Sequence, residues 1–248
     1  MGTTWLLFCG KPDMAYPFAR RMVAHDIDLN GLNVMVGIPA GRDLPALTVK
    51  SLLATQSLCH DLSVPFQLGM VVGSAVVQWA RDEVVDLFLQ SDATRLFWID
   101  SDMVWEPEQF MRLLALSQYR DVICASYPAK VDRPTFYVNW DERAGLQADE
   151  YGLIEIRGIG LGFTVMSRKV VEQLADKAPK VFDDVAKREL ASVFRIDSVG
   201  GKRQGEDMAF FSDIRALRYG VFLDPSVDLG HHGTKTYRGS IRDALKQG

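Results

Sequence analysis

The sequence has few cysteines and no long hydrophobic run. Its three cysteines, Cys9, Cys59 and Cys124, stand in apolar surroundings at no spacing typical of a metal site. An odd number of cysteines without a signal peptide favours a reducing compartment, so we expect a cytoplasmic protein whose thiols pack as small core residues. The apolar stretch near the amino terminus is far shorter than a membrane span, and we expect no membrane segment.

The sequence also lacks an excess of positive charge. Lys and Arg number 28 against 32 Asp and Glu, which gives a net charge of -4. This balance argues against a protein that binds nucleic acid through its overall charge, although it is compatible with a local basic patch. We find no internal repeat, low-complexity tract or linker, and therefore expect one domain over residues 1–248.

Strand-like and helix-like patterns alternate through the first half of the chain. Short apolar runs predict strands, and longer amphipathic stretches predict helices. Strands are expected at residues 32–39, 65–72, 95–100 and 121–128, and helices at 45–62, 74–92 (with Ser74 as N-cap) and 106–118. This alternation predicts an α/β fold whose mixed, mostly parallel sheet is flanked by helices.

After Pro128 the pattern changes. Polar loops separate strand-like segments, which predicts a smaller antiparallel part. Strands are expected at residues 135–140, 151–160 and 221–230, and helices at 168–178 and 205–220. We also expect a short strand and a helix (15–27) near the amino terminus, and a tail over residues 240–248.

Two acids follow the apolar strand "RLFWID". Asp100 and Asp102 would lie on the same face if the strand continued, and their repulsion would call for a cation. Carboxylates at this spacing suit a hard ion such as Mg²⁺ or Mn²⁺, which also takes phosphate oxygens as ligands. Because ligands bind beyond the carboxyl ends of strands in open sheets, the position favours a site. Two solvated acids on a surface turn are the plain alternative.

A second polar group follows the last predicted strand, in "DLGHHGTKTYRG". His231 or His232 has the chemistry of a metal ligand, and Lys235 and Arg238 have the charge to neutralise phosphates. A flexible basic tail with solvated histidines is the alternative.

The segment "GEDMAFF" begins a helix with Glu206 and Asp207. Acids are favoured there by the helix dipole, but either could also act as a general base toward an acceptor hydroxyl. In "GIGLGF", Gly160 and Gly162 leave room for a substrate beside the sheet, or mark a bulged strand.

Further residues are candidates for binding the donor or the acceptor. "GIPAGRD" contributes Pro39, Gly41 and Arg42, and Arg81 on the following helix has the fork geometry to clamp a diphosphate. Arg81 as an ordinary surface charge is an equally good interpretation. Trp105 is a candidate for stacking on an acceptor sugar or base, or else an ordinary rim residue.

Taken in order, these motifs resemble the GT-A family of nucleotide-sugar glycosyltransferases. The segments are "VGIPAGRD", "ARDEVVDLFLQSDATRLFWIDSDMVWEP", "DVICASYPAK", "GIGLGFTVMSRKVVEQL", "GEDMAFF" and "LGHHG". The resemblance covers about residues 32–239 and is closest to small stand-alone members of bacteria and phages. It implies a GT-A (Rossmann-like) fold, with a nucleotide-sugar half over about 32–128 and an acceptor half over about 129–239.

The resemblance also implies roles for the motif residues. Asp102 would bind Mn²⁺ or Mg²⁺ across the donor diphosphate, and Asp100 and Ser101 would face the donor or the metal. His231, with His232 as the second choice, would complete the metal shell. Asp207, with Glu206 second, would be the base of an inverting reaction. Related sequences have Asn where Asp82 stands, so no donor role is assigned to Asp82.

The expected activity is transfer of a sugar from a nucleoside diphosphate sugar, such as a UDP-sugar, to an acceptor hydroxyl. The acceptor would be a polysaccharide, a modified DNA base, as in a phage-type enzyme, or a protein side chain. A sugar-1-phosphate nucleotidyltransferase would have a fuller glycine-rich loop after the first strand. A non-catalytic nucleotide-sugar-binding protein would tolerate loss of acids that are all present here.

Overall fold

The computed structural model describes residues 29–141 and 145–245. The strand and helix expected within the first 27 residues lie outside these ranges, as do residues 246–248 of the expected tail. Within the described ranges, no helix is long and apolar enough to cross a membrane.

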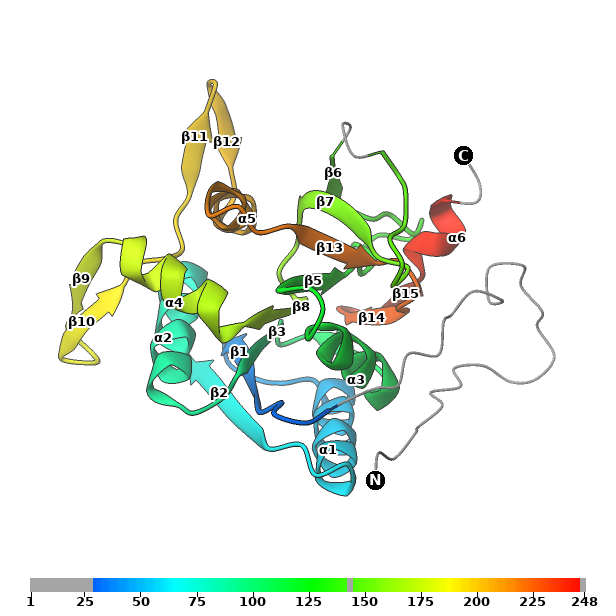
Figure 1. Ribbon diagram of the computed structural model, residues 1–248, viewed down its shortest axis with the longest axis horizontal. Coiled ribbons are helices and arrows are strands. Elements are labelled where there is room, and N and C mark those ends of the chain that lie inside the picture. Colours follow the sequence, from blue (N-terminus) through cyan, green and yellow to red (C-terminus); the bar gives the residue numbers. More distant parts are fainter. Residues whose placement is uncertain (1–28, 142–144, 246–248) are drawn as a thin grey trace.

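An eight-stranded sheet forms the centre of the described part of the chain (Figure 1). Its strand order is β2-β1-β3-β8-β5-β13-β7-β6. The strands are β1 (Val34–Ala40), β2 (Phe66–Val72), β3 (Arg95–Ile99), β5 (Val122–Ala125), β6 (Val138–Trp140), β7 (Ile154–Ile159), β8 (Phe163–Ser167) and β13 (Val221–Asp224). Only β8 and β7 run against the other strands of this sheet, as their antiparallel pairings require.

Helices cover both faces of this sheet. One face carries α1 (Ala46–Asp61) and α3 (Pro107–Leu116), and the other carries α2 (Val77–Gln90), α4 (Arg168–Lys177) and α5 (Glu206–Ala216). The alternation of β3 explains the two layers, because Leu96 and Trp98 join one core cluster while Phe97 and Ile99 join the other. The predicted fold class, α/β with a mixed, mostly parallel sheet flanked by helices, is confirmed.

Local sequence signals set several helix ends. Helix α3 begins with a capping box, in which the backbone N–H of Glu106 donates to the Gln109 side chain at 2.8 Å, and Pro107 follows as the first helical residue. Helix α2 differs from the prediction. It begins at Val77, and the hydroxyl of Ser74 donates to the Val76 carbonyl at 3.0 Å instead of capping the helix.

Shorter strands complete the second half of the chain. Two hairpins, β9 (Lys180–Asp183) with β10 (Arg188–Ala191) and β11 (Asp197–Val199) with β12 (Lys202–Gln204), project from the body in Figure 1. A separate small sheet joins β15 (Thr236–Gly239), β14 (Leu229–His232) and β4 (Met103–Val104). The expected tail begins with α6 (Ile241–Leu245). The β14–β4 pairing joins the two polar motifs found in the sequence.

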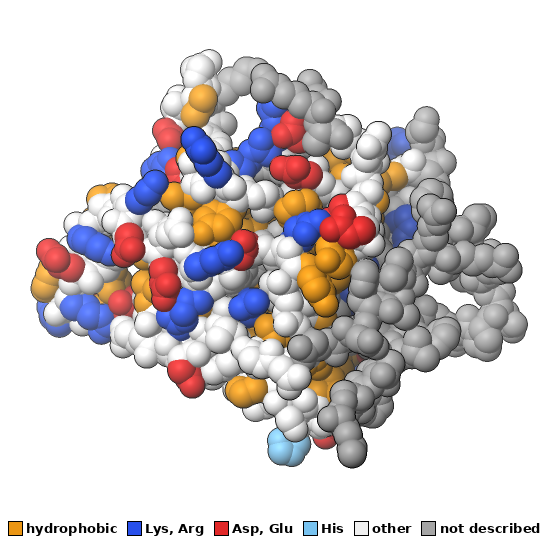
Figure 2. Space-filling view, in the orientation of Figure 1, with side chains coloured by type: hydrophobic (Ala, Val, Ile, Leu, Met, Phe, Trp, Pro, Cys, Tyr) orange, Lys and Arg blue, Asp and Glu red, His pale blue; other side chains and the backbone are white. Residues whose placement is uncertain are grey.

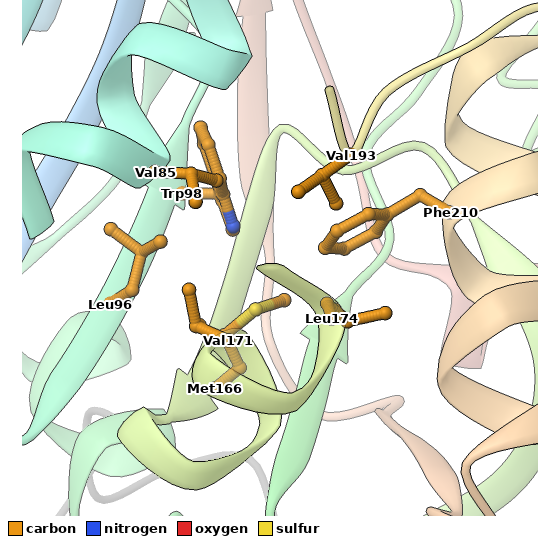
Figure 3. Close-up of a pocket in the computed structure, with 8 residues that line it drawn as sticks. All are labelled: Val85, Leu96, Trp98, Met166, Val171, Leu174, Val193 and Phe210. Carbon is orange, nitrogen blue, oxygen red and sulfur yellow. The ribbon is translucent and has the colours of Figure 1, made fainter. Parts of the chain in front are cut away.

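A small gap lies in the apolar core between α2, α4 and α5. Trp98, Val85, Val171 and Phe210 are among the side chains around it, and it has no room for a water molecule (Figure 3). The indole N–H of Trp98 has no hydrogen-bond partner among the described residues. This gap is a packing feature of the apolar core and shares no lining residue with the cavity described below.

Candidate active site

Asp102 lies where the small sheet meets the main one. Strand β14 runs antiparallel to β4, with His231 opposite Met103, and the His232 amide donates to the Asp102 carbonyl at 2.8 Å. This pairing brings the His231 Nε2 atom to 3.3 Å from Asp102 Oδ1. The ammonium of Lys130 bonds to the other carboxylate oxygen, Oδ2. Asp102 is therefore shared by an imidazole and an amine.

The ring of His231 is oriented by a backbone carbonyl. Its Nδ1 atom lies 2.9 Å from the Pro128 carbonyl oxygen. Because a carbonyl oxygen only accepts, Nδ1 must carry a proton, and Nε2 presents either a lone pair or a second proton to Asp102. A lone pair facing a carboxylate at this distance calls for a cation between them.

The residues around Asp102 hold it in its ionised form. Burial acts to raise the pKa of Asp102, but hydrogen bonds from His231 and Lys130, together with their charges, outweigh burial and lower it. The carboxylate is thus available as an anionic ligand at neutral pH.

Asp100 has different partners, because β3 ends at Ile99 and the next residues turn. Its Oδ1 atom lies 3.3 Å from Arg81, which also binds Asp207 and lies 3.5 Å from Glu206. The Arg81 side chain is 4% exposed and sits among three acids. The strand does not continue through the two acids, so the condition for placing both on one face is not met.

Burial raises the pKa of both Asp100 and Asp207, and repulsion from neighbouring acids adds to the effect, while Arg81 opposes it. Burial also acts to lower the pKa of Arg81, but the charges of Asp100 and Asp207 outweigh it and raise that pKa above its ordinary value. Arg81 is therefore a permanent cation that links the first acid of the D-x-D pair to the start of α5. It is not a surface charge.

The glycines of "GIGLGF" admit polar groups from neighbouring elements. A Cβ on Gly162 would lie 2.4 Å from Asp100 Oδ2, and one on Gly160 would lie 2.2 Å from the Tyr127 hydroxyl. That hydroxyl is 3.5 Å from Asp100 Oδ2, and the Asp100 amide donates to the Gly162 carbonyl at 3.0 Å. Both glycines are required for close approach to the site.

An open cavity of about 310 Å³ borders Asp102's two partners. Its lining combines two tyrosines with a lysine, a histidine, an isoleucine and small residues: Ser126, Tyr127, Ala129, Lys130, Tyr137, Ile159, Gly160 and His231. Tyr137 is 72% exposed, and the buried Ser126 hydroxyl has no partner among the described residues. Such a surface can hold a sugar or nucleotide through stacking and hydrogen bonds.

The other predicted residues have partners of their own or lie at exposed or partly exposed positions. The His232 ring contacts the Thr236 hydroxyl at 3.2 Å, so His231 is the histidine whose side chain meets Asp102. Lys235 pairs with Asp132 at 2.5 Å. The remaining donor-binding candidates lie on exposed or partly exposed turns and strand ends: Pro39, Gly41, Arg42, Ser101 and Arg238.

The prediction for Trp105 was wrong. Its side chain is 2% exposed, its indole N–H donates to the Thr55 hydroxyl at 2.8 Å, and it packs in the α1–α3 core cluster. The position next to the acids suggested a rim residue, but β4 turns Trp105 inward. It cannot stack on an acceptor.

Three residues that line the site were not identified from the sequence: Ser126, Tyr127 and Lys130. All three follow β5 in "ASYPAK", and the carboxyl end of β5 lies at the same edge of the sheet as that of β3. A lysine and a tyrosine directly after a buried strand were the available signal.

The residues present fit a magnesium or manganese ion. No cluster of three or more His, Cys, Asp or Glu side chains suited to a metal occurs within residues 29–141 and 145–245. Asp102 and His231 supply two ligands, and neighbouring ligands at Mg²⁺ bond lengths lie about 3 Å apart, close to their separation of 3.3 Å. Mg²⁺ commonly takes few protein ligands and completes its shell with phosphates and water.

The order of these elements is that of a GT-A-like (Rossmann-like) α/β fold. No family model matches the sequence, and no curated protein matches it. A crystal structure of GalNAc-T7 with UDP, GalNAc and Mn²⁺ superimposes with a TM-score of 0.50 at 11% identity, over 82% of this chain and 44% of that one. This chain thus spans less than half of GalNAc-T7, and the likeness establishes the fold alone.

A second solved structure is 4-diphosphocytidyl-2C-methyl-D-erythritol synthase from Anaerococcus prevotii. It matches with a TM-score of 0.36 at 11% identity, over 63% of this chain and 82% of that one. A likeness this weak carries no argument about function.

Proposed function

We propose that this protein is a metal-dependent glycosyltransferase that moves a sugar from a nucleoside diphosphate sugar to an acceptor hydroxyl. The observation that carries the proposal is the meeting of Asp102 and His231 beside the 310 Å³ cavity, at the carboxyl edge of the sheet. In this proposal, residues 32–128 form the donor half, and residues 129–239 supply the histidine and the base.

The chain's own residues would act by holding charge and protons. A divalent ion on Asp102 and His231 would supply positive charge to the leaving diphosphate. His231 is held by Pro128 so that Nε2 faces Asp102. Asp207, or Glu206 beside it, would take the proton of the acceptor hydroxyl, and Arg81 would fix that carboxylate relative to Asp100.

The donor is proposed to be a UDP-sugar, because the GalNAc-T7 structure contains UDP. Arg42, Pro39 and Gly41 at the end of β1, with Ser101, are the proposed contacts of the nucleotide. Gly160 and the tyrosines of the cavity are the proposed sugar-facing surface.

The test is hydrolysis and binding of a panel of nucleotide sugars with Mn²⁺, Mg²⁺ or EDTA. We expect release of a nucleoside diphosphate from one donor, lost with EDTA and reduced more than about 100-fold in Asp102→Asn and His231→Ala. His232→Ala is the matched control, since that ring does not contact the Asp102 side chain, and it should lose less than about ten-fold.

Two results would contradict the proposal. If no nucleotide sugar binds in the presence of either metal, the proposed site is wrong. Release of pyrophosphate from a nucleoside triphosphate and a sugar phosphate, in place of nucleoside diphosphate release, would make the protein a nucleotidyltransferase.

A further inference from the structure

Lys130 stands between the acid proposed to bind metal and the cavity proposed to bind the donor. Its ammonium bonds to Asp102 Oδ2, and the same side chain lines the cavity. The lysine side chain is 39% exposed, so its amine is able to exchange between partners. Asp102 Oδ1 faces His231, which leaves Oδ2 as the oxygen that the ammonium holds.

The backbone around Lys130 fixes where the side chain starts. The Ala129 amide donates to the Thr135 carbonyl, and the Val131 amide donates to the Ala129 carbonyl, both at 2.8 Å. These bonds close a short turn whose ends are held in place. The reach of the ammonium is therefore set by the side chain alone.

Gly233, just after the two histidines, makes room for the stem of Lys130. A Cβ at Gly233 would lie 3.1 Å from Lys130 Cδ and 3.6 Å from Cγ. The stem thus runs over the backbone of the β14–β15 turn, and its direction toward Asp102 is set by packing as well as by charge. This contact explains why a glycine follows the two histidines, since a larger residue there would crowd the Lys130 side chain.

We propose that Lys130 is an internal counter-cation of Asp102, which a divalent ion displaces, and that the released ammonium then binds the diphosphate of the donor. This inference rests on the function proposed above. An ammonium and a divalent ion repel each other at one carboxylate, so both cannot keep full contact with Asp102. The cavity that Lys130 lines would hold the anionic group that the freed ammonium pairs with.

This exchange couples the two ligands of the site. Metal binding must break the Lys130–Asp102 pair, which lowers metal affinity in the absence of nucleotide. When the nucleotide binds, its contact with the freed ammonium offsets the free energy lost in breaking that pair. By linkage, each ligand then raises the affinity for the other. Lys130 would bind the donor and, in addition, suppress binding of metal without donor.

The first experiment measures Mn²⁺ and UDP binding to the full chain by calorimetry. In Lys130→Met we expect Mn²⁺ alone to bind about three- to five-fold tighter, and UDP in saturating Mn²⁺ to bind about ten-fold weaker. Lys169→Met is the matched control, because Lys169 pairs with Asp121 at 2.9 Å and is not part of the site, and it should change neither affinity.

A second measurement follows the amine itself. Acetylation of Lys130, read by mass spectrometry of the wild type, should speed up on adding Mn²⁺ and slow again on adding UDP. If the wild type binds Mn²⁺ and UDP but Lys130→Met changes neither affinity and Lys130 labelling is unaffected by Mn²⁺, this inference is wrong and the proposed function stands. If the wild type binds neither Mn²⁺ nor UDP, both this inference and the proposed function are wrong.

Discussion

At the scale of single residues, the charge balance of the site depends on Arg81. This side chain is nearly fully buried and is the cation shared by Asp100, Glu206 and Asp207. The sequence left Arg81 open as a diphosphate clamp or a surface charge, and in the structure its guanidinium nitrogens contact carboxylates. Arg81 therefore links Asp100 to the start of α5, and its role is to position these carboxylates.

Replacing Arg81 by Met should destabilise the fold by about 3 kcal/mol at pH 8, because three acids would share a poorly solvated space without a cation. Raised pKa values mean that the folded acids bind protons more tightly than the unfolded ones, so this cost should shrink as the pH falls. Urea unfolding at pH 5 and pH 8 checks both points.

Arg188→Met is the control for that experiment. Arg188 pairs with Asp86 at the surface and is about half exposed, so its loss should cost far less than the loss of Arg81. A cost for Arg81→Met no larger than that of the control would show that the buried cluster is not balanced by this side chain.

At the scale of elements, α2 carries a second buried charge next to the first. Asp82 is 6% exposed, and its Oδ1 atom accepts hydrogen bonds from the amides of Val193 at 2.8 Å and Phe194 at 3.0 Å. These bonds tie α2 to the chain that follows β10. Burial raises the pKa of Asp82 to about 6, and the amide hydrogen bonds only partly oppose it. Asp82 thus has a structural role in place of contact with a donor.

This shift predicts a pH-dependent stability. Because the folded pKa is raised from 3.8 to about 6, the contribution of Asp82 is fully present below about pH 4 and is lost as the pH rises through 6. A difference of about two between the folded and unfolded pKa values corresponds to about 3 kcal/mol of stability lost at pH 8. Asp82→Asn keeps an acceptor for both amides, so it should match the wild type at pH 4 and be more stable by up to that amount at pH 8.

Urea unfolding of the two proteins between pH 4 and pH 8 provides the measurement. Asp184→Asn, at a position where the carboxylate is 92% exposed, should stay within about 0.5 kcal/mol of wild type throughout. A constant difference between Asp82→Asn and wild type across this range would contradict the titration of Asp82.

The elements of the first half could be predicted because their patterns are local. Alternating and helical apolar periods, with Pro at helix starts, fix α1, α3 and β3 within a few residues. The partners of the acids could not be predicted in this way. Lys130 rather than Lys235 binds Asp102, since the β14–β4 pairing and the β5 turn decide which lysine comes near, and neither is visible in sequence spacing.

At the scale of the whole molecule, the candidate site is built from distant parts of the chain. The Arg81–Asp207 contact joins residues 126 positions apart, and His231 reaches the Pro128 carbonyl across 103 positions. Only the complete sheet order brings β3, β5 and α5 to one edge. The function therefore depends on tertiary structure that short motifs merely indicate.

The charge of the whole molecule also limits which acceptor the proposed enzyme could use. The net charge is -4, and on the face shown in Figure 2 Lys and Arg side chains alternate with Asp and Glu. Non-specific binding of duplex DNA relies on a surface with many uncompensated cations. For the proposed glycosyltransferase, a mixed surface with net negative charge argues against an acceptor base in duplex DNA.

We therefore expect no appreciable binding of a fluorescent duplex that contains hydroxymethylated bases. Anisotropy at 150 mM salt should give a dissociation constant weaker than about 10⁻⁴ M. Lowering the salt to 50 mM should tighten binding little, because few phosphate contacts are available to release counterions. Binding that strengthens steeply as salt falls would reveal a basic surface beyond the face in Figure 2. The modified DNA base would then become the preferred acceptor, and the donor assay should be repeated with that duplex present.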